Sequence, residues 1–254
     1  MNTNPILIEI KDLTVTFSRW GQSVIALDHL SLTIPKAQWV MLVGHNGSGK
    51  STLLKSISRR LTPNTGEIFL GGKQASQMRS SEIAEQVFHV HQDPLLGTAP
   101  KLTLFENLMV ADHQAQVEDT PKRKLYDKYR VLLQPFGIDD RLKQLAQNLS
   151  GGERQLVAMV IARMRPSFVM LLDEPLAALD PSKSQECLNE IGKMHEEGKT
   201  ILQVTHDPLL AVNGGERTII LANGSVAYDK LGEERNIDDI RSCWTATTTW
   251  RKSR

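Results

Sequence analysis

The sequence predicts an α/β fold with a mixed or parallel central sheet, antiparallel strands before it and a helical region inserted into it. Apolar runs without alternation recur along the chain, and such runs suit strands that are buried on both faces. Each run is followed by glycine or polar residues, which is the usual layout of an open α/β sheet. Between two of the runs, positions 94–165 show a mostly helical, polar and charged pattern.

The N-terminal region is predicted to form the strands of an antiparallel subdomain. Apolar side chains occupy every second position over residues 6–10, although Leu7 blurs the alternation. Residues 13–17 and 30–34 alternate cleanly between apolar and polar side chains, and Pro35 ends the second of these segments.

The buried strands of the central sheet are predicted from longer apolar runs. The first, residues 39–43, leads into a glycine-rich loop, and residues 52–60 then have helical character. The other runs end at polar residues or at a hairpin-type turn: residues 168–172 before Asp173-Glu174, residues 200–204 before Thr205-His206-Asp207, and residues 218–221 before Asn223-Gly224.

We expect one domain over residues 1–230, with its core at 1–93 and 166–230 and the inserted helical subdomain at about 94–165. Residues 231–254 form a tail that is charged and then rich in threonine and tryptophan, and its role stays open.

Composition and charge narrow the class of protein. The 254-residue chain is 40% hydrophobic and 23% charged, which suits a soluble domain with a substantial core. A formal net charge of +1 gives no electrostatic argument for a nucleic-acid partner. Cys187 and Cys243 imply neither a disulfide framework nor a zinc cluster. No apolar run approaches the ~20 residues of a membrane-spanning helix, so another chain must supply any path through a membrane.

A phosphate-binding loop follows the first buried run. The pattern G-x-x-x-x-G-K-[ST] is matched at every position, and its glycines let backbone N–H groups point inward at a helix N-terminus. Lys50 would reach the β- and γ-phosphates of a nucleotide, and the Ser51 hydroxyl would bind Mg²⁺. A chance glycine-rich turn is the alternative, which the flanking strand and helix disfavour. The predicted ATP-binding set here is Gly44, His45, Asn46, Gly47, Ser48, Gly49, Lys50, Ser51 and Thr52.

Two further motifs accompany the loop. Asp173 and Glu174 close a buried strand, although a solvated acidic pair before Pro175 is possible from these residues alone. The run Leu149-Ser150-Gly151-Gly152-Glu153 precedes a helix that its serine can cap, but a cap does not explain two successive glycines. The loop, the LSGGE run and the acidic strand end together resemble the ATP-binding cassette family, whose ATPase subunits power ABC transporters. The resemblance covers residues 6–228.

The resemblance implies a role for each residue of the candidate catalytic set. Asp173 would hold the Mg²⁺ shell together with Ser51, and Glu174 would polarise the attacking water as general base. Gln92 matches the family's Q-loop glutamine, which contacts Mg²⁺ or the attacking water. His206 matches the switch histidine, which hydrogen-bonds the γ-phosphate and helps to hold Glu174 and the water in place.

The resemblance also implies residues that act across a dimer. In this family two cassettes pack head to tail, so Ser150 and Gly152 of one chain, with Gly151 between them, would contact the γ-phosphate bound at Lys50 of the other. Asp180 belongs to the D-loop along the seam, where this chain has Ala177 in place of the usual serine.

The family stacks an aromatic ring on the adenine base. Trp20 is the candidate in this chain, with Phe17 as the alternative, and core packing remains possible for either residue. Arg19 occupies a register where many relatives have tyrosine.

The fold implied by the resemblance is a P-loop NTPase with a RecA-like core sheet, an N-terminal antiparallel β subdomain and an inserted helical subdomain. Its implied activity is ATP hydrolysis with Mg²⁺, which energises solute transport through a separate permease of importer type. The alternative is a soluble non-transport ABC ATPase, for example of the cluster-assembly type. A small-molecule P-loop kinase would leave the LSGGE run and Gln92 without a purpose.

Several partners follow from this resemblance. They are a transmembrane permease, a second ATPase subunit that is expected to be an identical copy, and a solute-binding protein reached through the permease. The expected location is the cytoplasmic face of the inner membrane. Residues 92–100 resemble cassettes of importers for amino acids or similar solutes, which bears on lineage and not on cargo.

Overall fold

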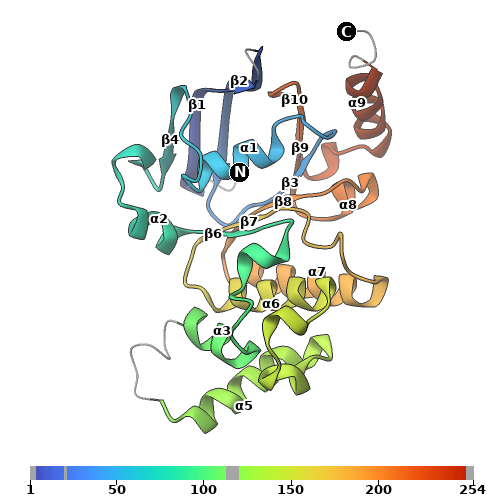
Figure 1. Ribbon diagram of the computed structural model, residues 1–254. Helices are drawn as coiled ribbons and strands as arrows, with labels where there is room; N and C mark the ends of the chain where they lie inside the picture. Colours follow the sequence, from blue (N-terminus) through green and yellow to red (C-terminus); the bar gives the residue numbers. More distant parts are fainter. Residues whose placement is uncertain (1–3, 20–21, 113–119, 250–254) are drawn as a thin grey trace.

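The computed structural model describes residues 4–19, 22–112 and 120–249. Two β-sheets pack on either side of helix α1 (Lys50–Ile57), and a group of helices lies at one end of the molecule (Figure 1). The predicted α/β fold, with its antiparallel strands and inserted helices, is confirmed.

The first sheet is antiparallel and has four strands in the order β2-β1-β4-β5. The segments expected at 6–10 and 13–17 form one continuous strand, β1. Its pairing register shifts around Lys11 and Asp12, and this shift keeps the apolar side chains of both segments on the side that faces the core. Asp12 accordingly has a positive φ of 51°. The strands are β1 (Ile6–Arg19), β2 (Gln22–Pro35), β4 (Thr65–Leu70) and β5 (Lys73–Gln74).

The second sheet has six strands in the order β10-β9-β3-β8-β7-β6 and carries the site. Strands β9, β3, β8, β7 and β6 are parallel, and β10 returns antiparallel to β9 after the turn at Asn223. The carboxyl ends of the parallel strands therefore meet at one edge. The strands are β3 (Trp39–Val43), β6 (Val87–Val90), β7 (Val169–Leu172), β8 (Thr200–Val204), β9 (Arg217–Ala222) and β10 (Ser225–Leu231).

The helices begin at recognisable capping signals. Thr103, Ser150 and Asp180 each accept a hydrogen bond from a backbone N–H in the first turn of the helix that follows. Within the described residues, the other helices are α2 (Ser80–Gln86), α3 (Leu104–Ala111), α5 (Lys122–Leu133), α6 (Gly151–Met164), α7 (Pro181–Glu196), α8 (Pro208–Asn213) and α9 (Ile237–Thr249). Short 3₁₀ turns occupy Ala75–Gln77, Pro94–Gly97, Gln134–Phe136, Asp139–Lys143, Ala146–Asn148 and Gly232–Glu234.

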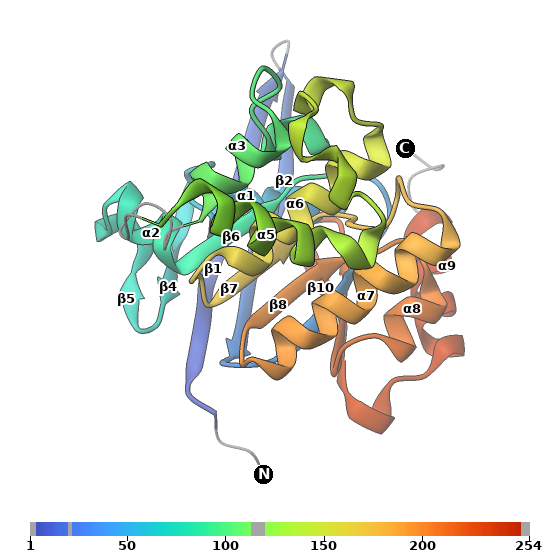
Figure 2. The same ribbon diagram turned by 90° about the horizontal axis from the view of Figure 1, so that it is seen from below.

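Two hydrophobic cores lie on opposite faces of the six-stranded sheet. One is shared by that face, α1 and the antiparallel sheet, and the other by the opposite face and helices α3, α5, α6 and α7. Helices α5 and α6 lie over the core strands in the view from below (Figure 2). Among the residues that the structure describes, no helix is both long and apolar enough to cross a bilayer.

Helix α9 belongs to the segment whose role the sequence left open. Its Ile240 is 0% exposed and packs with Val43, Ala211 and Ile220. Val43 is the last residue of β3, directly before the phosphate-binding loop. The division into a domain at 1–230 and a tail at 231–254 stays a prediction.

We predict that Ile240→Ala lowers the free energy of unfolding by ~2–4 kcal/mol, because it leaves a cavity where a fully buried side chain packs. Urea unfolding of the purified chain measures this change. Ile6→Ala is the matched control, since Ile6 is 49% exposed and its truncation should cost less than ~1 kcal/mol. Equal effects of the two substitutions would show that α9 does not pack on this core.

Candidate functional site

The phosphate-binding loop connects β3 to α1, and its lysine is buried. Lys50 is only 6% exposed, and its Nζ donates hydrogen bonds to the carbonyl oxygens of Gly44 at 2.7 Å and His45 at 3.1 Å. These bonds fold the loop around the ammonium group. The Gly224 N–H also donates to the Ser48 carbonyl at 3.1 Å, so the β9–β10 turn supports the loop from behind.

Two glycines of the loop have no room for a side chain. Gly44 has a φ of 153°, and a Cβ there would lie 2.4 Å from the Leu221 carbonyl oxygen. Gly49 has a φ of 106°, and a Cβ there would lie 2.5 Å from the Ala26 carbonyl oxygen. Both positions therefore require glycine for steric as well as conformational reasons.

Buried polar atoms of the loop lack partners within the described part of the chain. These are the Ser48 hydroxyl oxygen and His45 Nε2. A native fold rarely leaves such atoms unsatisfied, so their position in a glycine-rich loop at a helix N-terminus fits an anionic ligand.

Burial and opposite charge have opposing effects on the pKa values of Lys50 and Asp173 at the base of the loop. Burial lowers the pKa of Lys50, while Glu174 and Asp173 oppose that shift. Burial raises the pKa of Asp173, while a hydrogen bond from Ser51 and the charge of Lys50 oppose it. The hydroxyl of Ser51 and the carboxylate of Asp173 thus lie together beside the lysine, and oxygen donors of this kind suit Mg²⁺.

Glu174 receives two side chains from the neighbouring strands. It follows β7, and its Oε2 accepts a hydrogen bond from Nε2 of Gln92, beyond β6, at 3.2 Å. Its Oε1 lies 2.5 Å from Nε2 of His206, beyond β8. The parallel order β6-β7-β8 therefore brings these three predicted residues together. The adjoining pocket is lined by Asn46, Gly47, Gly49, Lys50, Ser51, Thr52, Gln92 and Glu174.

The backbone of Glu174 is strained. Its φ is 52°, which is the left-handed region and costs a non-glycine residue ~1–3 kcal/mol. The next residue is Pro175, and the conformation aims the carboxylate at Gln92 and His206. Such outliers concentrate at functional sites.

Sequence reasoning missed the residues that brace His206. The Thr205 N–H donates to the Leu42 carbonyl at 3.2 Å, and the Thr205 hydroxyl accepts from the Asp207 N–H at 3.0 Å. Asp207 Oδ1 accepts from the Leu209 N–H at 2.8 Å and caps α8. An aspartate directly before Pro208 at a helix start was the available signal.

The LSGGE residues lie at the N-terminus of α6 and do not line the pocket beside Lys50. Ser150 and Glu153 form a capping box, in which each side chain accepts the other's backbone N–H, at 3.2 and 2.7 Å. A Cβ at Gly152 would lie 2.9 Å from the Ala178 carbonyl oxygen, whereas one at Gly151 would meet open space. Packing within the chain therefore explains the glycine at position 152 but not the one at position 151.

Asp180 also lies away from that pocket. Its Oδ1 accepts a hydrogen bond from the Lys183 N–H at 2.9 Å and caps α7.

Of the aromatic candidates for adenine stacking, Trp20 lies outside the described residues. Phe17 pairs with Val24 across β1 and β2 and is 42% exposed.

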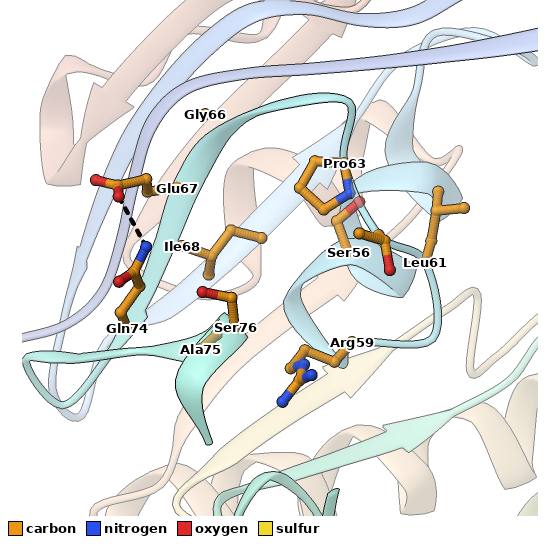
Figure 3. Close-up of a pocket in the computed structure, with 11 residues that line it drawn as sticks. Ser56, Arg59, Leu61, Pro63, Gly66, Glu67, Ile68, Gln74, Ala75 and Ser76 are labelled. Carbon is orange, nitrogen blue, oxygen red and sulfur yellow. Dashed lines mark hydrogen bonds between the residues drawn. The ribbon is translucent and has the colours of Figure 1, made fainter. Parts of the chain in front are cut away.

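A second pocket lies beside the far end of α1 and shares no residue with the one at Lys50 (Figure 3). Three of its polar side chains already have partners. Gln74 donates to Glu67 at 2.7 Å, and Arg59 donates to the Met78 carbonyl. This pocket therefore offers less unsatisfied polar chemistry than the phosphate-binding loop.

Two buried histidines lie close to Gln92 in the chain. The rings of His89 and His91 are 4.1 Å apart, and each residue is 7% exposed. Burial and the nearby His91 and Arg60 lower the pKa of His89 to about 3. Burial and Arg60 lower the pKa of His91 to about 4. Both imidazoles are thus neutral in the folded chain near pH 7.

A family model described as ABC transporter matches residues 27–177. The tyrosine transport ATP-binding protein of Clostridioides difficile is 33% identical over 235 residues, which is 90% of this chain and 94% of that protein. The xylose/arabinose import ATP-binding protein XylG of Sulfolobus acidocaldarius is 31% identical over 248 residues, which covers 94% of both. The macrolide export ATP-binding/permease protein MacB of Vibrio parahaemolyticus is 34% identical, but this chain spans only 36% of its length.

Solved structures agree with this match. A dimeric ATP-binding cassette in a post-hydrolysis state, bound to ADP and Pi, superposes with a TM-score of 0.80 at 26% identity. The likeness covers 89% of this chain and 98% of that cassette. The ATP-binding subunit of an ABC transporter also gives a TM-score of 0.80, at 25% identity and over 95% of this chain and 99% of that subunit.

The buried histidines predict a loss of stability in mild acid. In the unfolded chain they take up protons near pH 6.5, whereas in the folded chain they stay neutral down to about pH 4. The free energy of unfolding should therefore fall as the pH drops from 7 to 5. We expect His89→Phe to remove roughly 1–2 kcal/mol of that fall, measured by urea unfolding at the two pH values.

His29→Asn is the control for this experiment. His29 is an exposed histidine whose pKa is raised by the hydrogen bond that its ring donates to Asp12, so its removal should leave the fall in place. A wild-type pH dependence in His89→Phe would contradict the neutral, buried state of this side chain.

Proposed function

The chain belongs to the ABC transporter family, and on that premise we propose that it is the ATP-hydrolysing subunit of a solute importer with a separate permease. The observation that carries the proposal is the meeting of Gln92, Glu174 and His206 beside the phosphate-binding loop. These groups are the ones needed to hold and polarise a water molecule next to a bound γ-phosphate.

The nucleotide would bind along residues 44–52. Lys50 would exchange the carbonyls of Gly44 and His45 for phosphate oxygens, which keeps its buried charge compensated. The similar cassette bound to ADP and Pi supports a nucleotide at this loop. Trp20, with Phe17 as the alternative, is the residue that we expect to stack on adenine.

The residues around Asp173 fit Mg²⁺. The Ser51 hydroxyl and the Asp173 carboxylate already contact each other, and the Gln92 side chain lies at the edge of the same pocket. When bound there, Mg²⁺ would neutralise charge on the β- and γ-phosphates. Ser51, Asp173 and Gln92 are the residues that would hold it.

Glu174 is the proposed general base. His206 and Gln92 hold both of its carboxylate oxygens, so the carboxylate is oriented before a water molecule arrives. With a nucleotide bound, His206 Nε2 would instead donate to the γ-phosphate, because its single N–H cannot serve both acceptors. A positioned base of this kind typically contributes ~10²–10⁴ in rate.

A second copy of the chain would complete each site. Ser150, Gly151, Gly152 and Asp180 do not line the pocket of their own Lys50, so within one chain they have no phosphate to contact. The dimeric cassette structures support a head-to-tail pair in which the N-terminus of α6 meets the partner's nucleotide. Both halves of the site occur in this sequence, so we propose a homodimer.

The importer assignment rests on relatives of matching length. The tyrosine transport protein and XylG are named as ATP-binding proteins, and this chain spans 94% of each. A chain of this kind would work at the cytoplasmic face of the inner membrane, attached to a permease that receives its solute from a binding protein. The transported solute would contact those partners and not this chain.

We predict that Glu174→Gln keeps ATP binding, lowers turnover by ~10²-fold or more and traps an ATP-bound dimer, because the general base is lost while the pocket is kept. Phosphate release and size-exclusion chromatography with saturating ATP measure these effects. Glu196→Gln, an exposed change on the outside of α7, is the control and should behave as wild type. A Glu174→Gln chain that stays monomeric and turns over at the wild-type rate would refute the assignment.

Ser150→Arg tests the contribution across the dimer. We expect it to abolish turnover while the affinity of the isolated monomer for nucleotide stays unchanged, because a large side chain would block the partner's phosphate and not the chain's own loop. Nucleotide titration at concentrations below dimerisation, set beside steady-state hydrolysis, separates the two effects. An equal loss of monomer affinity would contradict the proposed geometry.

A further inference from the structure

A third pocket adjoins Glu174 and shares no other residue with the pocket at Lys50. It encloses about 370 Å³, which lies within the ~300–1,000 Å³ typical of small-molecule pockets. It is lined by residues 174–177 after β7, by residues 203–207 at the end of β8, and by residues of α7 and α8. These two helices lie next to each other beside β8 (Figure 1).

Gln203 lines this pocket and has an unpaired amide nitrogen. The residue is 0% exposed, and its Oε1 accepts a hydrogen bond from Trp39 Nε1 at 3.1 Å. Its Nε2 has no acceptor among the residues that the structure describes. Native folds rarely leave a buried donor unpaired, so this amide is suited to an acceptor atom that the chain does not supply.

The rest of the lining favours a neutral, mainly apolar molecule. Leu176, Leu188 and Leu210 line the pocket and are only half-buried, so an apolar ligand would remove more of their surface from water. Glu174 and Asp207 line it as well, whereas none of its described lining residues is lysine or arginine. Two carboxylates would therefore repel an anionic ligand.

We propose that this pocket is a regulatory site for a neutral, mainly apolar small molecule whose carbonyl oxygen accepts a hydrogen bond from Gln203 Nε2. The bound molecule lowers the rate of ATP hydrolysis. The regulatory role rests on the proposed function, whereas binding of the molecule does not.

The pocket is lined by the two residues whose contact must change during hydrolysis. His206 Nε2 lies 2.5 Å from Glu174 Oε1, and both residues line the pocket. Under the proposed function, His206 leaves Glu174 to donate to the γ-phosphate. A ligand that packs against both residues favours the arrangement in which they touch, so it opposes that step. ATP would still bind, because the two pockets share only Glu174.

Binding of N,N-dimethylbenzamide tests the site, because this probe has an apolar ring, a carbonyl acceptor and no charge. We expect it to bind the nucleotide-free chain, measured by ligand-observed NMR, and benzoate to bind roughly tenfold more weakly or less, because like charges repel. Ser184→Phe, on α7, should abolish binding by filling the pocket. Gln185→Phe, on the exposed neighbour outside the lining, should bind the probe as wild type does.

Gln203→Met tests the hydrogen bond. Methionine has a similar size but no amide, so we expect the probe to bind roughly three- to tenfold more weakly, while isopropylbenzene, which has no acceptor, binds unchanged. A crystal soaked with the probe gives an independent measurement. Its carbonyl oxygen should lie within ~3.2 Å of Gln203 Nε2, and this distance decides the question if Gln203→Met does not fold.

Steady-state hydrolysis tests the regulation. At a saturating concentration the probe should lower kcat roughly fivefold or more, the low end of a typical coupling between two sites. KM for ATP should change little, because the nucleotide has its own pocket. The turnover of Ser184→Phe should be the same with and without the probe.

The outcomes separate the site from the proposed function. A wild-type chain that hydrolyses no ATP would overturn the proposed function and the regulation with it, and the binding measurements would still decide whether the site exists. Absence of binding, equal binding of benzoate, or unchanged binding by Ser184→Phe would overturn the site. Binding without a fall in kcat would overturn the regulatory role alone.

Discussion

Lys50 carries a positive charge into a position where only 6% of its surface is exposed, and burying a charge is costly unless it is compensated. The compensation comes from distant parts of the chain. The Gly44 and His45 carbonyls accept its hydrogen bonds, and the carboxylates of Asp173 and Glu174 oppose the loss of its proton. The parallel sheet is what brings these groups together, because β3 and β7 end at the same edge on either side of β8.

Much of this arrangement can be predicted from the sequence because it rests on local patterns. Strands at 39–43 and 200–204 have the predicted bounds, since an apolar run between polar ends leaves little freedom. Strand β6 was missed because it has only four residues, and His89 interrupts its apolar pattern. The bulge at Asp12 was missed for a related reason: alternation shows which side chains share a face but not whether the strand continues through a break.

In the candidate site too, local motifs can be predicted from the sequence, whereas contacts between distant segments cannot. Residues 44–51 form a local motif that can be recognised from spacing alone. The contacts of Glu174 with Gln92 and His206 depend on strand order, which no local pattern gives, and the family resemblance supplied them. The brace at Thr205 depends on hydrogen bonds between adjacent residues, and it leaves only a weak capping signal in the sequence. Residues that would act across a dimer cannot be located from one chain by geometry alone.

The close contact between Gly152 and Ala178 has a consequence for communication between sites. A Cβ at Gly152 would lie 2.9 Å from the Ala178 carbonyl oxygen, so glycine at this position lets the N-terminus of α6 lie directly against that carbonyl. Ala178 lies on the short segment that leaves Glu174 and ends at the cap of α7. In a dimer of the proposed kind, one chain's α6 would touch its partner's nucleotide while its own Glu174 serves the other nucleotide. Each site would therefore register whether the other is occupied.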